Sequence, residues 1–382
     1  LFMGFTAGFV GNQAIAQSLA VYHSEQGGMP GDKPAQQKKF LLVGGDLSGI
    51  QKHIFHIEKS HGAGVAKILR ARSFMLQATV RCVVNVLLEE LGLMPQARIM
   101  DAGGEFILLL PNTDKVRSAL PEFEARVQRW FLTAYQGEVS LPLAYDVELT
   151  ENDLLMENFP AKLNTLQDSL QRSKLHRFDS LFREGFDPVL FHDLSSYSSG
   201  ACHVCTIHPV DEESSNKFRS EYGREIPVCS SCFQQIDIVG RLLPRSGYVI
   251  FSRATSGEGV ELFDGVGLRL VNEVRPENSD ALEIINLKGF GEYAHLPVAG
   301  HLPSYTEEDV TKLLQLNELE PADKDNWIWT REEEQVRDGV PKTLNMLAHE
   351  ARMLEDAEDS TDMRGKALLA GLKADVDNLG MI

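Results

Sequence analysis

The chain has 382 residues, with 37 basic and 55 acidic side chains and a formal net charge of -18. At roughly 150 residues per domain, this length predicts two or three domains, and the mixture of 43% apolar and 24% charged residues excludes disordered, collagen-like and coiled-coil proteins. No run approaches the roughly 18 uninterrupted apolar residues of a membrane helix, and the apolar start lacks the basic residues of a secretory signal. We therefore expect a cytoplasmic protein without membrane contact. The acidic balance also argues against an autonomous nucleic-acid binder, because such proteins neutralise phosphates with an excess of Lys and Arg.

The first part of the chain predicts a β-α-β-β-α-β order of elements. Apolar residues at helical spacing predict helices over residues 7–23, 64–91 and 116–135, with Gly92 ending the second. Apolar runs predict strands over residues 40–43, 97–100, 106–110 and 141–149. Gly103-Gly104 supplies the positive φ angles of a tight hairpin between the second and third strands. This order is the ferredoxin-like arrangement, which many unrelated functions use, so it alone says little about chemistry.

The second part predicts smaller, less regular segments. Residues 152–199 read as helical and then irregular, and two cysteine pairs follow. Strands are expected near residues 248–251, 260–263 and 268–270, followed by an acidic helix or linker over residues 332–362. A new apolar run over residues 367–374 ends in acidic residues, as the strand over residues 40–43 does, which suggests two copies of one domain. We also expect the chain to be a piece of a longer protein.

Two CxxC pairs are the strongest chemical signal. Cys202 and Cys205 precede Cys229 and Cys232 by about two dozen residues, a spacing typical of a structural zinc site with four thiolates. The alternatives are chance turns or redox dithiols. Four thiolates would make a closed site, which serves as scaffolding rather than catalysis. The fifth cysteine, Cys82, lies in a helical pattern and is expected to be buried and inert.

Carboxylates at strand ends are the second signal. Asp46 follows a predicted buried strand, Ser48 lies in the next turn, and Glu105 follows the Gly103-Gly104 hairpin. This arrangement is found in palm-type polymerases and nucleotide cyclases, where such carboxylates share magnesium and the glycines admit a nucleotide. The alternative is that the glycines only form a turn and Asp46 caps the next element.

Three further sequence patterns can each be interpreted either as a functional site or as an ordinary structural feature. Asp375 and Asp377 are two apart, so on a strand they share one face and meet one metal, whereas in a turn they are merely solvated. The His192-Asp193 dipeptide lacks the further ligands of a metal-dependent phosphohydrolase. A basic stretch with two histidines is suited to phosphate contact or to a solvated helix face, and its members are Lys52, His53, His56, Lys59, Lys67, Arg70 and Arg72.

Several motifs together resemble a known family, the large subunit of type III CRISPR effector complexes, in its Csm (III-A) version. The matching stretches are LLVGGDLSGIQKHIF (residues 41–55), LRARSFMLQ (69–77), DAGGEFILLLPN (101–112), the two CxxC pairs and LKADVDNLG (372–380). The resemblance implies an α+β chain with a ferredoxin-like palm domain, a four-cysteine zinc linker and the start of a second palm. It divides the chain into a remnant of an HD domain and linker (1–38), a first palm (39–150), a helical and zinc-binding linker (151–245), a β-rich insert and acidic linker (246–365) and the first strand of a second palm (366–382).

The resemblance also implies an activity for the intact protein. It would cleave single-stranded DNA through an upstream HD domain and convert ATP to cyclic oligoadenylate when target RNA binds, by two-metal nucleotidyl transfer. Asp375 and Asp377 would hold magnesium or manganese for the second palm, and the first-palm residues Asp46, Ser48, Gly103, Gly104 and Glu105 would lie at a nucleotide. The implied partners are other Csm-type subunits, guide RNA, target RNA, ATP and single-stranded DNA.

Two departures from the family pattern limit this expectation. The catalytic Gly-Gly-Asp-Asp hairpin and the HD metal ligands of the family are absent from the sequence, so we expect the chain alone to be inactive. The first palm is normally non-catalytic, yet Glu105 and Asp101 leave open a weak metal site with Asp46. The competing hypothesis is a zinc-stabilised scaffold subunit that binds partner proteins and guide RNA without catalysis.

Overall fold

The computed structural model of the chain forms two compact units. It describes residues 2–26, 36–55, 65–184, 197–222, 226–253, 259–275, 281–287, 306–307, 353–354 and 363–364. Unit 1 contains Leu1–His56, Arg72–Ser198 and Val249–Ile285, and unit 2 contains Ile57–Ala71, Ser199–Tyr248 and Asn286–Ile382. The predicted strand with Asp375 and Asp377, the His192-Asp193 dipeptide, and Lys59 and His56 all lie outside the described residues.

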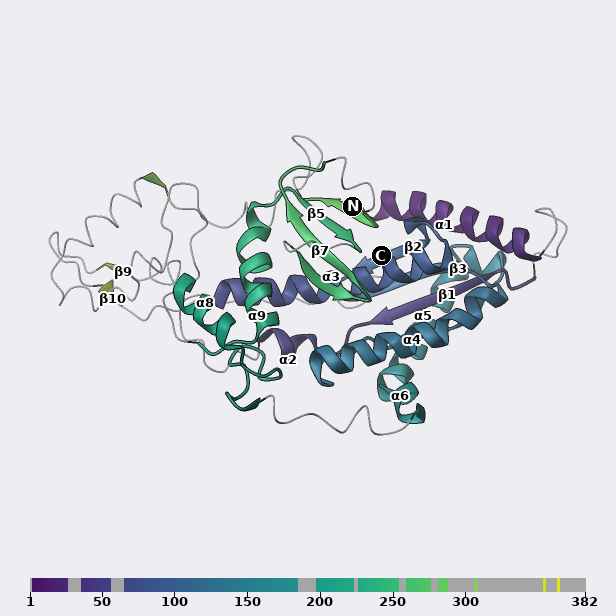
Figure 1. Ribbon diagram of the computed structural model, residues 1–382. Helices are drawn as coiled ribbons and strands as arrows, with labels where there is room; N and C mark the ends of the chain where they lie inside the picture. The colour runs from purple at the N-terminus through teal and green to yellow at the C-terminus, as the bar shows by residue number, and fades with distance from the viewer. Residues whose placement is uncertain are drawn as a thin grey trace, which may run out of the picture. The chain divides into compact units, whose positions relative to one another are not determined.

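Unit 1 is built on a four-stranded antiparallel sheet in the order β2-β3-β1-β4 (Figure 1). Its strands are β1 (Phe40–Asp46), β2 (Arg98–Ala102), β3 (Glu105–Pro111) and β4 (Leu143–Leu149). Between β1 and β2 come α2 (Ile50–Phe55), α3 (Val65–Leu91) and the short η1 (Pro95–Ala97), and α4 (Asp114–Tyr135) separates β3 from β4. The observed element order is the predicted one. The first six residues of β1 are buried, as expected for a central strand with a continuous apolar run.

The turn between β2 and β3 contains two residues. Gly103 and Gly104 have φ angles of 64° and 101°, which a residue with a Cβ atom rarely adopts. The predicted Gly-Gly hairpin is therefore confirmed. Asp264 and Gly265 form a similar turn in the second sheet, with φ angles of 52° and 72°.

One face of the first sheet is covered by α1 (Phe2–Gln26) and α5 (Phe159–Leu175). Side chains alternate along a strand, so Phe40 and Leu42 of β1 point to this face together with Ile107 and Leu109 of β3. The buried members of this core are Ala14, Phe40, Leu42, Ile107, Leu109, Ala144, Val147, Leu149, Leu166 and Leu170. The same alternation directs the side chains of Asp46 and Glu105 to the α1 and α5 face.

A second four-stranded sheet has the order β6-β7-β5-β8. Its strands are β5 (Tyr248–Ser252), β6 (Val260–Phe263), β7 (Val266–Val271) and β8 (Glu283–Asn286), which correspond to the three strands expected in this region and one more. Phe263 packs edge-on against Phe123 of α4, with ring centroids 5.9 Å apart. The short elements η2 (Asn152–Leu154) and α6 (Asp179–Glu184) complete the described part of unit 1.

Unit 2 contains α8 (Glu212–Tyr222) and a helical run made of α9 (Ser230–Gln234), η4 (Gln235–Gly240) and η5 (Leu243–Arg245). Its apolar core combines the four cysteines with Ile68, Val204, Ile207, Phe218, Val228 and Ile236. Two further strands of two residues each, β9 (Met353–Leu354) and β10 (Met363–Arg364), pair antiparallel. Among the described residues, no helix combines the length and the apolar character needed to cross a bilayer.

Candidate metal centre and acid pair

The four cysteines predicted as ligands come together in unit 2. Their sulfur atoms all lie within 4.8 Å of one another, and all four side chains are buried. The sulfurs of Cys205 and Cys229 are 3.9 Å apart. All four remain free thiols rather than disulfides. A tetrahedral zinc ion with Zn–S distances of about 2.3 Å places its sulfurs about 3.8 Å apart, so the cluster is close in size to a tetrahedral four-thiolate site.

Tight turns of the backbone in both CxxC pairs direct the four thiol groups towards one another. In the first pair, the Thr206 N–H donates to the Cys202 carbonyl at 2.8 Å, and Thr206 takes a left-handed φ of 59° that closes the turn. In the second pair, Cys229 caps the N-terminus of α9, and its sulfur accepts the Cys232 N–H at 3.4 Å. The N–H groups of Val204 and Ile207 similarly donate to the sulfurs of Cys202 and Cys205 at 3.4 Å.

These backbone donors favour negative charge on sulfur. Hydrogen bonds from the thiols of Cys205, Cys229 and Cys232 also lower the pKa of Cys202, so one member of the cluster ionises first. Hydrogen bonding within the cluster raises the pKa of Cys232, because further ionisation would place like charges together in an apolar interior. A bound dication removes that conflict, which is why the donor set fits a structural metal.

The other cysteine and the nearby histidines behave differently. Cys82 is fully buried in unit 1, and burial raises the pKa of its thiol to about 12, in agreement with the predicted inert role. His203 and His208 lie in the turns around the cluster, but the group of metal-ligand atoms within the described residues contains only the four sulfurs.

The two strand-end carboxylates also come together. Asp46 at the end of β1 is the register partner of Glu105 at the start of β3, so their side chains emerge side by side on the α5 face. Lys174 of α5 forms an ion pair with Asp46, and the Gln167 side chain donates to Glu105 at 2.5 Å. Burial raises the pKa of Glu105, and the neighbouring Asp46 charge raises it further. A cation and a hydrogen-bond donor from the chain itself therefore fill the space between the carboxylates and α5.

The remaining predicted nucleotide residues surround the same strand end. Gly103 is exposed at the tip of the hairpin, whereas Gly104 is buried, and a Cβ atom there would come within 3.2 Å of Leu47 and Ile50. The Leu47 N–H donates to the Gly104 carbonyl at 3.1 Å. Ser48 exchanges two backbone hydrogen bonds with Ser140, of 2.8 and 3.2 Å. The glycine required at position 104 is thus explained by packing within the chain.

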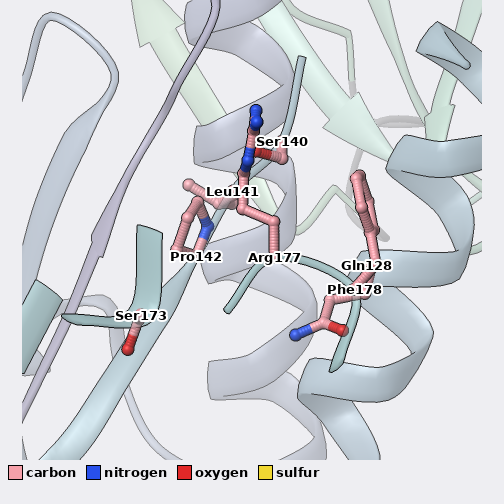
Figure 2. A pocket seen from close by; sticks show the side chains of 7 residues that line it. All are labelled: Gln128, Ser140, Leu141, Pro142, Ser173, Arg177 and Phe178. Carbon is pink, nitrogen blue, oxygen red and sulfur yellow. The ribbon is translucent and has the colours of Figure 1, made fainter. Parts of the chain in front are cut away.

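A shallow pocket lies beside this strand end (Figure 2). Pro142, one of its lining residues, accepts the Asp46 N–H at 3.3 Å. The hydroxyl oxygen of Ser140 is buried and has no hydrogen-bond partner among the described residues, and Arg177 lines the same pocket. The lining residues come from four separate segments, so no motif in the sequence predicts the pocket: Gln128, Ser140, Leu141, Pro142, Ser173, Arg177 and Phe178.

Sequence reasoning missed the partners of the acid pair. Gln167 and Lys174 are seven residues apart, which places them two turns apart on one face of α5. The seven-residue spacing could have shown that the two side chains share a helix face. It does not show that they contact the acid pair until α5 is known to cover the sheet.

Comparisons with known proteins find relatives of this part of the chain. The family model for Csm1 subunit domain B matches residues 39–188. The chain is 30% identical over 218 residues to the CRISPR system single-strand-specific deoxyribonuclease Cas10/Csm1 (subtype III-A) of Enterococcus italicus, covering 56% of this chain and 26% of that protein. It is 32% identical over 204 residues to the protein of the same name from Mycobacterium tuberculosis, covering 51% of this chain and 24% of that protein.

Solved structures give similar coverage. The Csm1-Csm4 subcomplex of the type III-A CRISPR-Csm interference complex matches with a TM-score of 0.47 and 22% identity, over 66% of this chain and 29% of that chain. A Csm1-Csm4 cassette in complex with one ATP matches with a TM-score of 0.46 and 23% identity, over 66% and 28%. The chain thus spans about a quarter of the length of the curated relatives given above. The match to Csm1 subunit domain B contains the whole first sheet, and the matched part of the chain is similar to the Cas10/Csm1 proteins of subtype III-A CRISPR systems.

Proposed function

We propose that the chain is part of the large subunit of a type III-A RNA-guided antiviral complex. The observation that carries this proposal is the Csm1 domain B match over residues 39–188, which contains the whole β2-β3-β1-β4 sheet and α5. In the intact protein, a second palm would make cyclic oligoadenylate from ATP when target RNA binds, and an upstream HD domain would cleave single-stranded DNA. The partners would be other Csm-type subunits, guide RNA and target RNA.

The first sheet is proposed to be a ferredoxin-like palm. The strand order, the antiparallel pairing of β1 with both β3 and β4, and the two connecting helices support this assignment. We retain the expected division of the chain into an HD remnant and linker (1–38), first palm (39–150), zinc linker (151–245), β-rich insert and acidic linker (246–365) and the start of a second palm (366–382).

The two candidate sites would have different roles. Zinc held by Cys202, Cys205, Cys229 and Cys232 would cross-link the core of unit 2 and leave no open coordination position, so its role is structural. The ion pair between Asp46 and Lys174 supports a non-catalytic first palm, in which Gly103, Gly104, Ser48 and Glu105 shape the face toward a nucleotide. Free buried thiols suit a reducing compartment, so we place the protein in the cytoplasm.

Catalysis is assigned to Asp375 and Asp377 of the second palm. Magnesium or manganese bound there would supply the charge that activates a ribose hydroxyl and stabilises the leaving pyrophosphate of ATP. The described part of the chain would then act as the scaffold against which the second palm holds its nucleotide. This division of roles keeps the scaffold hypothesis for the first palm while assigning synthesis to the whole protein.

The test is made in the full-length protein assembled with its guide complex. Asp375→Ala should abolish the formation of cyclic oligoadenylate from ATP after target RNA is added, measured by chromatography of the products. The matched control is Asp46→Asn in the first palm, which should leave most of the synthesis intact because Lys174 already neutralises Asp46. Unchanged synthesis in Asp375→Ala would contradict the catalytic assignment, and absence of any product from the unaltered complex would favour a pure scaffold.

A further inference from the structure

The start of α3 packs against the four-cysteine core of unit 2. α3 is one continuous helix, but its residues 65–71 belong to unit 2 and its residues 72–91 belong to unit 1. The Ile68 side chain has no exposed surface and lies in the same apolar core as the four cysteines and Ile236 of η4. The burial of Ile68 therefore depends on the core that the thiol groups help to build.

A close backbone contact joins the same part of α3 to the helical run that carries two of the cysteines. The run starts after Cys229, which caps α9, includes Cys232 and reaches Gly240, the last residue of η4. A Cβ atom at Gly240 would lie 2.7 Å from the Lys67 carbonyl oxygen, which is close enough to require glycine there. The Arg70 guanidinium donates to the Gly240 carbonyl at 2.7 Å. One end of the run thus carries thiol groups, and the other end contacts α3.

Two arginines of the LRARSFMLQ stretch (residues 69–77) attach the two parts of α3 separately. Arg70 donates to Gly240 within unit 2, whereas Arg72 donates to the His53 carbonyl at 2.8 Å within unit 1. The Arg72 side chain is buried, and the part of α3 that follows it contributes several apolar side chains to the core. Residues 72–91 therefore have an attachment of their own in unit 1, independent of the thiol core.

We propose that the metal centre of unit 2 controls the length of α3. With a metal bound, the thiol core and the Gly240 contact hold residues 65–71 in the helix; without the metal, these residues unfold and α3 starts near residue 72. A helix end without tertiary packing frays readily, and binding of a structural metal contributes its free energy to the fold around it. The proposal rests on the zinc site of the proposed function and extends its effect to a helix that continues into unit 1.

The alternative is a helix start that needs no metal. Leu69, Arg70 and Ala71 are residue types that favour helices, so the helix could extend from residue 72 towards its N-terminus by local propensity alone. The two possibilities differ in what happens to residues 65–71 when the metal is removed, because propensity does not depend on the thiol groups.

The experiment measures hydrogen–deuterium exchange by mass spectrometry in the whole 382-residue chain, first loaded with zinc and then stripped by a chelator. The first four N–H groups of a helix have no partner within it, so the amides of Leu69, Arg70 and Ala71 are the reporters. Loss of the metal should speed their exchange on the order of tenfold, while the amides of residues 80–91 stay protected. Unchanged exchange of the reporters after zinc release would overturn the proposal. Equal loss of protection over residues 80–91 would also overturn it, because the whole chain would then have unfolded.

A variant of the Gly240 contact separates the helix start from the thiol groups. Gly240→Ala places a Cβ atom against the Lys67 carbonyl and removes no ligand, so the zinc-loaded variant should still exchange faster at the reporters. It should also bind zinc more weakly, because linked equilibria are reciprocal. The matched control is Arg241→Ala, which changes the neighbouring exposed side chain and its pair with Asp237, and should leave the exchange unchanged.

The outcomes distinguish this proposal from the zinc assignment. A chain that takes up no zinc would contradict the zinc site and the metal-dependent helix start together. Zinc uptake without any change in reporter exchange would contradict only the helix start. Exchange in zinc-loaded Gly240→Ala that equals exchange in Arg241→Ala would overturn the role of the Gly240 contact.

Discussion

The four-thiol cluster of unit 2 and the acid pair of unit 1 both bring together side chains of types that commonly bind metals, but their surroundings differ. The four sulfurs contact one another and accept hydrogen bonds from backbone N–H groups. Asp46 is instead paired with Lys174, and Glu105 accepts a hydrogen bond from Gln167. Both sites therefore bring together groups that could bind a metal. The acid pair differs in that Lys174 of the chain itself supplies a counter-ion.

The difference shows how a pair of carboxylates at two strand ends can be neutralised without a metal. A buried carboxylate without a cation is costly, so loss of a metal must be balanced by protonation or by a new cation. The Lys174 ammonium supplies that charge from α5, and the sheet keeps its register. Among the described residues, the printed donors to the thiol cluster are backbone N–H groups, which supply only partial charges, so a dication would balance the thiolates more completely.

The largest effect is expected from removal of one of the four proposed zinc ligands. Cys229→Ser deletes one sulfur and the cap of α9, so we expect bound zinc to fall from about one ion per chain to near zero, as measured by mass spectrometry of metals. Structural zinc contributes on the order of 10 kcal/mol to small sites, so unit 2 should also lose its protection from proteolysis.

Cys82→Ser is the matched control for this variant. It removes a buried thiol from unit 1, where the sulfur faces the carbonyl groups of Phe263 and Val266. Its zinc content should equal that of the unaltered chain. Equal zinc loss in both variants, or no zinc in a chain never exposed to chelator, would remove the distinction between the two sites.

A second self-neutralised cluster in unit 1 gives the next largest effect. Glu283 of β8 accepts two hydrogen bonds from Arg81, at 2.7 and 2.8 Å, and one from Asn85 at 2.9 Å. Arg98 is a further donor at 3.3 Å, and its side chain is only 8% exposed. Glu283→Gln leaves the Arg98 charge without its main partner, so we expect the free energy of unfolding to fall by about 3 kcal/mol in urea titrations.

The exposed pair between Glu89 and Arg253 provides the comparison for this change. Its side chains are 38% and 48% exposed, and such surface pairs contribute about 0–1 kcal/mol. The loss in free energy of unfolding caused by Glu89→Gln should therefore be less than a third of the loss caused by Glu283→Gln. Equal losses in the two variants would show that burial does not govern the internal charge pairs of unit 1.

Much of this architecture was predictable from local sequence. The Gly103-Gly104 turn follows from the φ angles that a two-residue hairpin requires, and the cysteine cluster follows from the spacing of the two pairs. Helix and strand boundaries shift by a few residues; β1, for example, continues through Gly44 and Gly45 to Asp46. These features depend on neighbours in the chain, which a sequence displays directly.

The neutralisation of the acid pair depends on residues far apart. Lys174 lies 128 residues after Asp46, and Glu283 lies 202 residues after Arg81. Each of these side chains looks like an ordinary surface charge until a helix or strand is placed against its partner. The sequence therefore predicts well which carboxylates lie close together. It predicts poorly which side chains neutralise them.

The smallest expected effect addresses that neutralisation directly. Lys174→Met keeps the side-chain volume but removes the cation from Asp46, so we expect a loss of about 1–2 kcal/mol in the free energy of unfolding at pH 7. Glu105 already has a pKa above its ordinary value of 4.5, because burial and the Asp46 charge favour its neutral form. Without Lys174 the folded state should take up a proton still more readily than the unfolded chain, so stability should rise as the pH falls and the penalty should shrink between pH 7 and pH 5.

Lys162→Met on the same helix is the control, because Lys162 contacts Asp153 at 3.5 Å without a second carboxylate partner of its own in the described contacts. We expect it to cost about 0.5 kcal/mol or less at pH 7. Urea titrations at pH 7 and pH 5 measure both variants. If millimolar magnesium or manganese stabilised the unaltered chain and Asp46→Asn abolished that gain, the acid pair would be a metal site. The metal ion would then replace the Lys174 ammonium as the partner of Asp46. The acid pair and the thiol cluster would differ in which metal they bind.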